Sequence, residues 1–163
     1  MGELQVRGPW VAASYYKMPQ LDEKWTGDGW LRTGDVVTVN PHGYLRIVDR
    51  TKDLIKTGGE WISSVDLENA IVGFPGVQEA AVVAVSHPKW DERPVAVIVA
   101  SEPKPSVEAL NDFLGQRFAK WQLPDAYVFV DELPHTSTGK LLKSALRERY
   151  RDYLSHSLST AQH

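Results

Sequence analysis

The spacing of hydrophobic and polar residues divides the chain into two parts with different patterns. In residues 1–50, short apolar runs alternate with turn signals, which is typical of strands joined by tight turns. The predicted strands cover residues 4–6, 30–33, 36–39 and 44–48. The turn signals lie at residues 8–9, 27–29 and 40–43. This part predicts a small antiparallel β meander, with room for a helix only near residues 14–24.

From residue 53 onward the pattern is mixed helix and strand. Apolar runs, two of them dense in Val and Ala, predict strands at residues 53–56, 78–85, 94–100 and 126–130, with a loop over 86–91. Serine is a good helix N-cap, and it precedes the first two of three predicted helices. These helices run from Ser63 or Ser64 to Gly73, from Ser106 to Phe118 and from Leu141 to Leu154.

Apolar residues at helical spacing also predict which helix faces are buried. The second helix is expected to bury Val107, Leu110, Leu114 and Phe118. The third helix is expected to bury Leu142, Ala145, Leu146 and Tyr153.

The two patterns meet in the charged run 49–53, where no Gly/Ser linker occurs. We therefore predict an α+β chain in three parts. A β meander occupies 1–50, a compact α+β domain with a short sheet and about three helices occupies 51–155, and a flexible tail occupies 156–163. A charged join of this kind favours a defined hinge over a loose tether.

Composition narrows the class of protein. The formal net charge is −3, which argues against a general nucleic-acid binder. The chain has no cysteine, so disulfides, thiolate zinc sites and a cysteine nucleophile are excluded. No apolar run approaches a membrane span and no signal peptide is evident, which predicts a cytoplasmic protein that is not transmembrane. No metal is expected, because no metal-ligand spacing relates the five histidines, His42, His87, His135, His156 and His163.

The first motif that could carry chemistry is Thr33-Gly34-Asp35. A carboxylate placed after a glycine can accept two hydrogen bonds from a ribose diol. The alternative is a plain turn with a capping aspartate, because Gly-Asp is common in turns.

The second motif is the segment 49–63, which places alternating charges beside Gly58-Gly59. Adjacent glycines allow a backbone to approach a ligand closely or to adopt positive φ. A tight turn between two short strands with salt-bridged flanks explains the same residues, so both interpretations stay open.

The third motif is the segment 134–143, a Thr/Ser/Gly loop that presents Lys140 ahead of a helix. Such a loop can bind a phosphate. It is not a Walker loop, because Pro134 stands where that motif needs Gly and Leu141 where it needs Ser or Thr. The alternative is the glycine-containing start of a helix with an exposed lysine.

Taken together and in this order, the motifs resemble the C-terminal part of the acyl-adenylate-forming enzymes, the AMP-binding superfamily that includes acyl-CoA synthetases. The matching segments are 2–9, 30–35, 43–45, 49–56 and 134–140. Segments 58–68 and 119–124 are most similar to medium- and long-chain fatty acyl-CoA ligases, and also to ligases for short thioether acids.

The resemblance implies a fold and a reaction. Residues 1–50 would be the last β subdomain of a large adenylation domain, and 51–155 the small mobile domain. The implied ligase joins a carboxylic acid, here a fatty acid, to CoA. It consumes ATP with Mg²⁺, passes through acyl-AMP, and releases AMP and diphosphate. The chain would then be a C-terminal fragment, truncated near Met1 and inactive by itself.

The resemblance also implies roles in the adenylation half-reaction and in domain rotation. Lys140 would be the catalytic lysine of adenylation. Asp35 and Arg50 would bind the nucleotide ribose. Lys52 stands at the hinge about which the small domain turns between the two half-reactions.

A second set of residues is implied in the CoA half-reaction. Gly58, Gly59 and Glu60 would line the tunnel for the pantetheine arm of CoA, and Trp61 is expected to form a wall of it. Lys56 lies near the active site of some relatives in the rotated state, so its role here stays open.

The implied partners are ATP or AMP, CoA, the acid and the N-terminal domain of the same enzyme. A homo-oligomer stays open, because apolar surface on residues 1–50 favours association. One alternative is a stand-alone interaction or regulatory module that reuses the small domain. Another is a kinase-like phosphate binder, which the Walker mismatch opposes. The sequence upstream of residue 1 would discriminate a fragment from a module.

Overall fold

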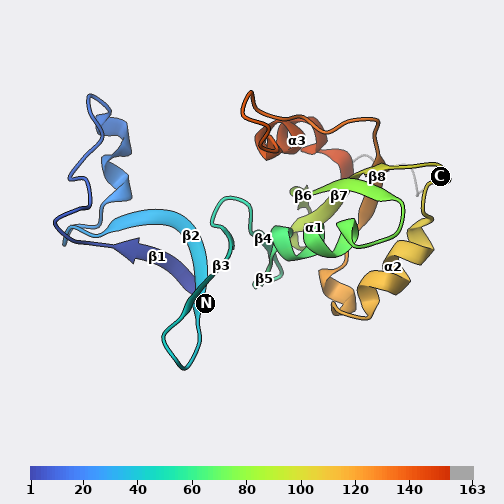
Figure 1. Ribbon diagram of the computed structural model, residues 1–163, viewed down its shortest axis with the longest axis horizontal. Helices are drawn as coiled ribbons and strands as arrows, with labels where there is room; N and C mark the ends of the chain where they lie inside the picture. Colours follow the sequence, from blue (N-terminus) through green and yellow to red (C-terminus); the bar gives the residue numbers. More distant parts are fainter. Residues whose placement is uncertain (155–163) are drawn as a thin grey trace. The chain divides into compact units, whose positions relative to one another are not determined.

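A computed structural model describes residues 1–154, apart from the side chains of residues 20–22. The chain divides into two compact units, Met1–Lys52 and a second unit that begins at Asp53 (Figure 1). Assignment of these units to the large and small domains of an enzyme stays a prediction. The predicted tail over 156–163 lies outside the described residues.

The first unit is a three-stranded antiparallel sheet in the order β1-β2-β3, which confirms the meander. The strands are β1 (Gly2–Val6), β2 (Leu31–Val39) and β3 (Leu45–Arg50), and the 3₁₀ helix η1 (Pro19–Lys24) lies between β1 and β2. The prediction of separate strands at 30–33 and 36–39 is wrong, because β2 continues through Gly34. That residue has a φ of 76° inside the strand, so it bends the strand instead of ending it.

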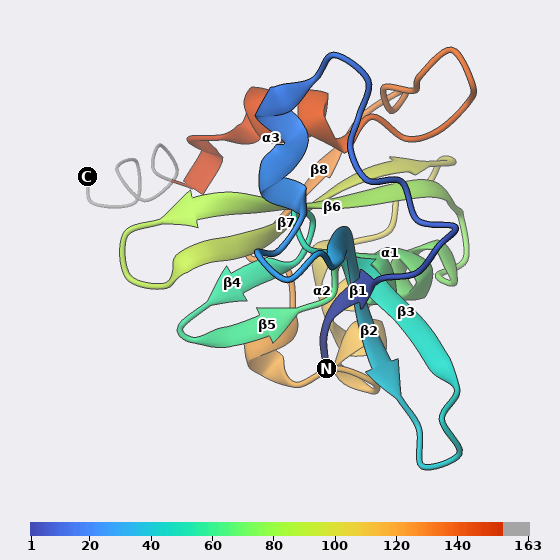
Figure 2. The ribbon, with the colours of Figure 1, turned by 90° about the vertical axis from the view of Figure 1, so that its left-hand side faces the viewer.

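The second unit is built on a five-stranded sheet with the order β5-β4-β7-β6, in which β8 also pairs with β7 (Figures 1 and 2). The strands are β4 (Ile55–Thr57), β5 (Glu60–Ile62), β6 (Val77–His87), β7 (Asp91–Ala100) and β8 (Ala126–Phe129). All pairings are antiparallel except β7 with β8.

The β6–β7 connection is shorter than the predicted loop over 86–91. Pairing reaches His87 and Asp91, so only three residues join the strands. The Nδ1 atom of His87 accepts hydrogen bonds from the backbone N–H groups of Lys89 (3.1 Å) and Trp90 (3.3 Å). These bonds close the hairpin and fix the position of Trp90.

Three α-helices and a 3₁₀ helix accompany this sheet in the described part of the second unit. They are α1 (Ser64–Val72), α2 (Val107–Gly115), η2 (Lys120–Gln122) and α3 (Lys143–Tyr150). The predicted serine caps are confirmed. The Ser63 side chain accepts from the backbone N–H of Asp66, and the Ser106 side chain accepts from that of Ala109.

The predicted helix faces need correction. Helix α2 ends at Gly115, so Phe118 lies beyond it, and Val107 at its first position is exposed. Helix α3 begins at Lys143, two residues later than predicted, because Leu142, with φ −94° and ψ 72°, has a non-helical backbone. Leu142 and Tyr153, which lie before and after the helix, are exposed. Leu146 is buried as predicted, together with Tyr150 and Leu154.

Both faces of the second sheet are covered, which explains the continuous apolar runs of β6 and β7. Successive residues point to opposite faces, so Ala80 and Val82 enter one core while Ala81 and Val83 enter the other. Helices α1 and α2 pack on the first face, and α3 packs on the second. No helix in residues 1–154 is long and apolar enough to cross a membrane.

Candidate functional site

Asp35 and Arg50, which lie in different sequence motifs, are brought together in the first unit. They pair across β2 and β3, and the Nε atom of Arg50 lies 2.9 Å from the Oδ1 atom of Asp35. The backbone N–H of Asp35 donates to the Thr33 hydroxyl, which donates to the carbonyl of Leu4. The Thr-Gly-Asp segment is therefore fixed by two neighbouring strands.

A cavity of about 500 Å³ opens beside this pair. Four basic and two acidic residues are among its nine lining residues, which are Glu3, Glu23, Lys24, Arg32, Thr33, Gly34, Arg50, Thr51 and Lys52. An excess of cationic side chains suits an anionic ligand. Of the predicted site residues, Arg50 and Lys52 line the cavity, and Asp35 contacts its wall through Arg50.

The Gly58-Gly59 pair forms the two-residue turn of the β4–β5 hairpin. The φ angles are 56° and 88°, as a hairpin turn of type I′ requires at both central positions. Gly58 also donates its backbone N–H to the carbonyl of Trp90, and a Cβ atom on Gly58 would lie 3.0 Å from the Trp90 ring. Glycine at these positions therefore permits a tight turn, and at residue 58 it also permits close contact with the Trp90 ring.

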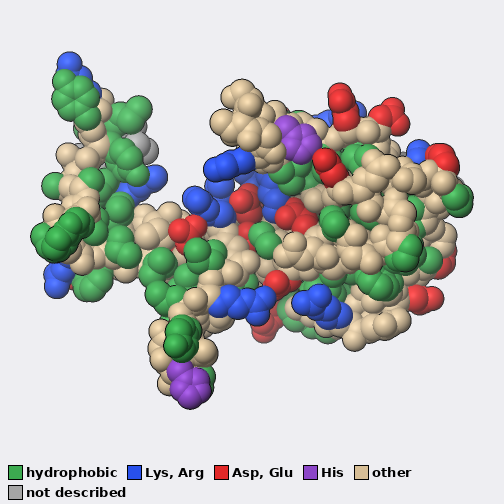
Figure 3. Space-filling view, viewed as in Figure 1, with side chains coloured by type: hydrophobic (Ala, Val, Ile, Leu, Met, Phe, Trp, Pro, Cys, Tyr) green, Lys and Arg blue, Asp and Glu red, His purple; other side chains and the backbone are tan. Residues whose placement is uncertain are grey.

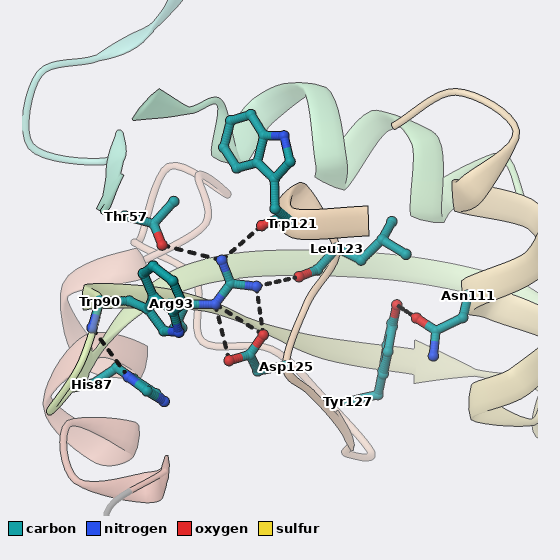
Figure 4. A network of polar contacts seen from close by, with 9 residues as sticks. All are labelled: Thr57, His87, Trp90, Arg93, Asn111, Trp121, Leu123, Asp125 and Tyr127. Atoms are coloured by element: carbon teal, nitrogen blue, oxygen red, sulfur yellow. Dashed lines mark hydrogen bonds and ion pairs between the residues drawn. The ribbon is translucent and has the colours of Figure 1, made fainter. Parts of the chain in front are cut away.

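A second cavity, of about 420 Å³, lies against this turn. Figure 4 draws five of the residues that line it, Thr57, Trp90, Arg93, Trp121 and Asp125. Its lining residues are Thr57, Gly58, Glu60, Trp90, Arg93, Trp121 and Asp125. Only Gly58 and Glu60 of the predicted tunnel residues belong to it. Trp61 instead pairs across the hairpin with Lys56, whose Nζ atom lies 5.7 Å from the centre of the Trp61 ring.

Five residues that line this second cavity were not predicted as site residues from the sequence: Thr57, Trp90, Arg93, Trp121 and Asp125. Arg93 carried a usable signal, because a charged residue at the start of a buried Val/Ala strand needs a partner of opposite charge. Trp90 and Trp121 gave no such signal in the sequence, because large aromatic side chains occur both in hydrophobic cores and in the walls of cavities.

Lys140 belongs to a compact turn outside helix α3. The Thr136 N–H donates to the Lys140 carbonyl at 2.7 Å, and the Lys140 N–H donates to the Thr136 hydroxyl at 3.1 Å. The Gly139 N–H donates to the Thr136 carbonyl. Because the turn uses these N–H groups internally, they do not form a phosphate cradle. Within the described residues the Lys140 ammonium has no ion-pair or hydrogen-bond partner. It is therefore available to bind an anionic group of a ligand.

Helix α3, which follows this turn, is fastened by half-buried ion pairs. The Nζ atom of Lys143 lies 2.6 Å from a carboxylate oxygen of Glu68 on α1 and donates to the Ser64 hydroxyl at 2.8 Å. Arg147 pairs with Asp53, the first residue of the second unit. Figure 3 shows basic and acidic side chains interspersed on the visible face of this unit. The turn therefore rests on a fixed support.

The structure does not bring Lys140 together with the Gly58 cavity. Figures 1 and 2 both show the 134–142 segment beside α3, away from the β4–β5 hairpin. Residues 1–154 contain no group of three or more His, Asp or Glu side chains that could hold a metal ion. The second unit therefore offers two separate candidate surfaces, one with a lysine and one with a cavity.

Comparison with known proteins shows which family this chain is similar to. Residues 66–140 match the model of the family described as the AMP-binding enzyme C-terminal domain. This match confirms the resemblance to the C-terminal part of adenylate-forming enzymes.

Individual relatives refine the class. The chain is 57% identical to a long-chain-fatty-acid–CoA ligase of Thermus thermophilus over 94% of its own length and 29% of the relative's. It is 52% identical to a 3-methylmercaptopropionyl-CoA ligase of Ruegeria lacuscaerulensis, over 94% of the chain and 28% of the relative. The chain thus spans less than a third of the length of these ligases.

Solved structures show the same fold. The ATP-bound MatB from Rhodopseudomonas palustris has a TM-score of 0.83 and 34% identity, and the match covers 93% of this chain and 31% of that one. The o-succinylbenzoate CoA synthetase from Bacillus subtilis, in complex with its acyl-adenylate intermediate, has a TM-score of 0.81 and 36% identity, over 90% and 30%.

The Gly58-Gly59 turn predicts a graded loss of stability. Gly59→Ala is expected to cost about 1–2 kcal/mol, because Ala resists the left-handed backbone that Gly59 adopts. Gly58→Ala should cost more, since its Cβ also meets the Trp90 ring. Denaturant unfolding of the 163-residue chain measures both variants.

The matched control is Gly115→Ala, which lies at the end of α2 in ordinary backbone with no heavy atom within 4 Å of the added Cβ. It should leave the free energy of unfolding unchanged or raise it, because Ala favours helices. Equal losses of unfolding free energy for Gly58→Ala and Gly59→Ala would show that the Trp90 ring moves aside at little cost and does not restrict residue 58.

Proposed function

We propose that this chain supplies the C-terminal share of an ATP-dependent, AMP-forming acyl-CoA ligase. Such a ligase converts a carboxylic acid and ATP to acyl-AMP and diphosphate, and then transfers the acyl group to CoA with release of AMP. The observation that carries the proposal is the 57% identity to a CoA ligase over 94% of the chain. The rest of the active site would come from residues outside this sequence.

The proposed role of Lys140 is electrostatic. Attack of a carboxylate on the α-phosphorus of ATP, which is bound with Mg²⁺ as the substrate complex, brings like charges together. An ammonium near the carboxylate and phosphate oxygens offsets this repulsion where water is excluded. The unpartnered Lys140 side chain on a self-bonded turn suits this task, because no competing carboxylate of the described residues holds it.

The cavity of the first unit suits the nucleotide. The Asp35 carboxylate accepts hydrogen bonds and Arg50 donates them, so together they match the hydroxyl groups of a ribose. Their mutual ion pair holds both side chains in place. Lys52 is the last residue of the first unit, which supports its proposed role as the hinge.

The cavity at Gly58 and Glu60 suits the CoA thiol arm. A turn without side chains at residues 58–59 leaves room for a narrow chain, and Trp90 and Trp121 add apolar walls. Because Lys140 and this cavity lie on different parts of the second unit, we propose that each half-reaction uses one of the two surfaces. The unit would then turn between the half-reactions.

The test of this function is a chimeric ligase in which this chain replaces the matching 29% of the Thermus thermophilus long-chain ligase. We expect the chimera to form acyl-CoA and AMP from a long-chain fatty acid, ATP and CoA. A folded chimera that forms neither product, beside an active parent enzyme, would contradict the proposal and favour a stand-alone interaction module.

We further propose that the natural acid is a fatty acid, because fatty-acid ligases are among the similar relatives at 57% and 46% identity. The complete enzyme that carries this chain should therefore show a higher kcat/KM for medium- or long-chain fatty acids than for 3-methylmercaptopropionate. The reverse order would assign the enzyme to the thioether acids that the Ruegeria relatives are named for.

Lys140→Ala in the chimera should lower ATP–pyrophosphate exchange about a hundred- to a thousandfold, the usual effect of losing one electrostatic donor. Formation of acyl-CoA from preformed acyl-AMP should change by less than about threefold, because that step does not need the lysine. Stopped assays of the two half-reactions provide the measurement.

The control is Lys104→Ala, which removes an exposed lysine paired with Glu102 at 3.7 Å on the same unit. It should affect neither half-reaction. Equal losses in both half-reactions for Lys140→Ala would refute a specific role in adenylation.

A further inference from the structure

Strand β7 changes its partner along one edge, and Arg93 lies at the change. At Asp91 this edge pairs with Thr57 of β4, and from Val95 onward it pairs with β8. The ladder is therefore interrupted between Asp91 and Val95. At its C-terminal side, the Pro94 carbonyl accepts the backbone N–H of Asp125, the residue that leads into β8.

The Arg93 side chain bridges this interruption (Figure 4). Its Nε atom donates to both carboxylate oxygens of Asp125 at 2.9 Å, and Nη2 donates to Oδ1 at 2.6 Å. Nη1 donates to the Thr57 hydroxyl at 3.1 Å. One guanidinium thus ties the end of β4 to the start of β8.

The remaining guanidinium donors hold the segment that contains η2. Nη1 also donates to the Trp121 carbonyl at 2.7 Å, and Nη2 donates to the Leu123 carbonyl at 3.2 Å. All five N–H donors of the side chain are therefore used. Arg93 is only 8% exposed, so its guanidinium has lost most of its hydrating water, and these hydrogen bonds compensate for that loss.

Three of the four residues that Arg93 bonds line the 420 Å³ cavity. Thr57, Trp121 and Asp125 line it together with Arg93 itself, and Gly58 follows Thr57 directly. These residues come from three segments that are far apart in the sequence. Within residues 1–154 no strand pairing joins β4 to the Trp121 segment, whereas Nη1 of Arg93 donates to both Thr57 and the Trp121 carbonyl, so the forked, planar side chain spans the distance between them.

We propose that Arg93 is a positioning residue that sets the width of this cavity and so controls the thiol-transfer half-reaction. The inference rests on the proposed function, because it takes CoA as the occupant of the cavity. Arg93 acts through Thr57 and Trp121, which form the walls. Lysine cannot replace it, since one ammonium cannot reach both walls and the Asp125 carboxylate in the same geometry.

The test compares Arg93→Lys and Thr57→Val with the unsubstituted chimeric ligase. Thr57→Val removes one acceptor of the network with almost no change of shape, so it stays informative if Arg93→Lys does not fold. Both variants should raise the KM for CoA, by about tenfold or more for Arg93→Lys, because small displacements of a binding wall are costly. ATP–pyrophosphate exchange should stay within about twofold of the unsubstituted chimera.

The matched control is Tyr127→Phe. Tyr127 lies on β8 and its hydroxyl donates to Asn111 at 2.8 Å, outside the residues that line the cavity. Circular dichroism melts of all variants report on folding. The control should lower the melting temperature without changing the KM for CoA, which separates a general loss of stability from a change in the cavity.

The possible outcomes distinguish the role of Arg93 from the proposed function of the chain. A parallel fall of both half-reactions, an unchanged KM for CoA in Thr57→Val, or an equal rise in Tyr127→Phe would each overturn the role of Arg93. None of these results touches the proposed function, because the unsubstituted chimera remains active in each. An inactive unsubstituted chimera would instead overturn the proposed function and this inference with it.

Discussion

The pairing of β6 with β7 is the interaction on which the second unit depends. The register runs from Val77 opposite Ala100 to His87 opposite Asp91, and it carries small and branched apolar residues on both faces. Each face supports its own core, so the helices on either side are held by the same two strands. Strands β4 and β8 share the remaining edge of β7.

The β6–β7 hairpin also explains why the candidate site of the second unit has fixed parts. Trp90 lies in its turn and Arg93 follows on β7, so one wall of the cavity belongs to the most deeply buried element of the unit. Glu68 of α1 accepts the backbone N–H of Val82 on β6 and also pairs with Lys143. The support of the Lys140 turn is therefore connected to the same strand pair.

Local signals in the sequence predicted most of the elements but not their bounds or their junctions. The buried strands, the capped starts of α1 and α2 and the α+β class follow from apolar runs and from Ser63 and Ser106, which act on their nearest neighbours. The continuity of β2 through Gly34 could not be predicted, since a glycine bends or ends a strand according to its cross-strand partners. The bonds of Arg93 to Asp125 and Thr57 join residues 32 and 36 positions apart, and only the folded sheet brings them together.

Three hydrogen bonds within the Thr136–Lys140 turn hold its backbone, and this has a consequence for how the segment meets other molecules. If the second unit turns between the half-reactions as proposed, these internal hydrogen bonds need not break when the loop changes its surroundings. A turn that already holds its shape loses less conformational entropy on docking than a disordered loop would.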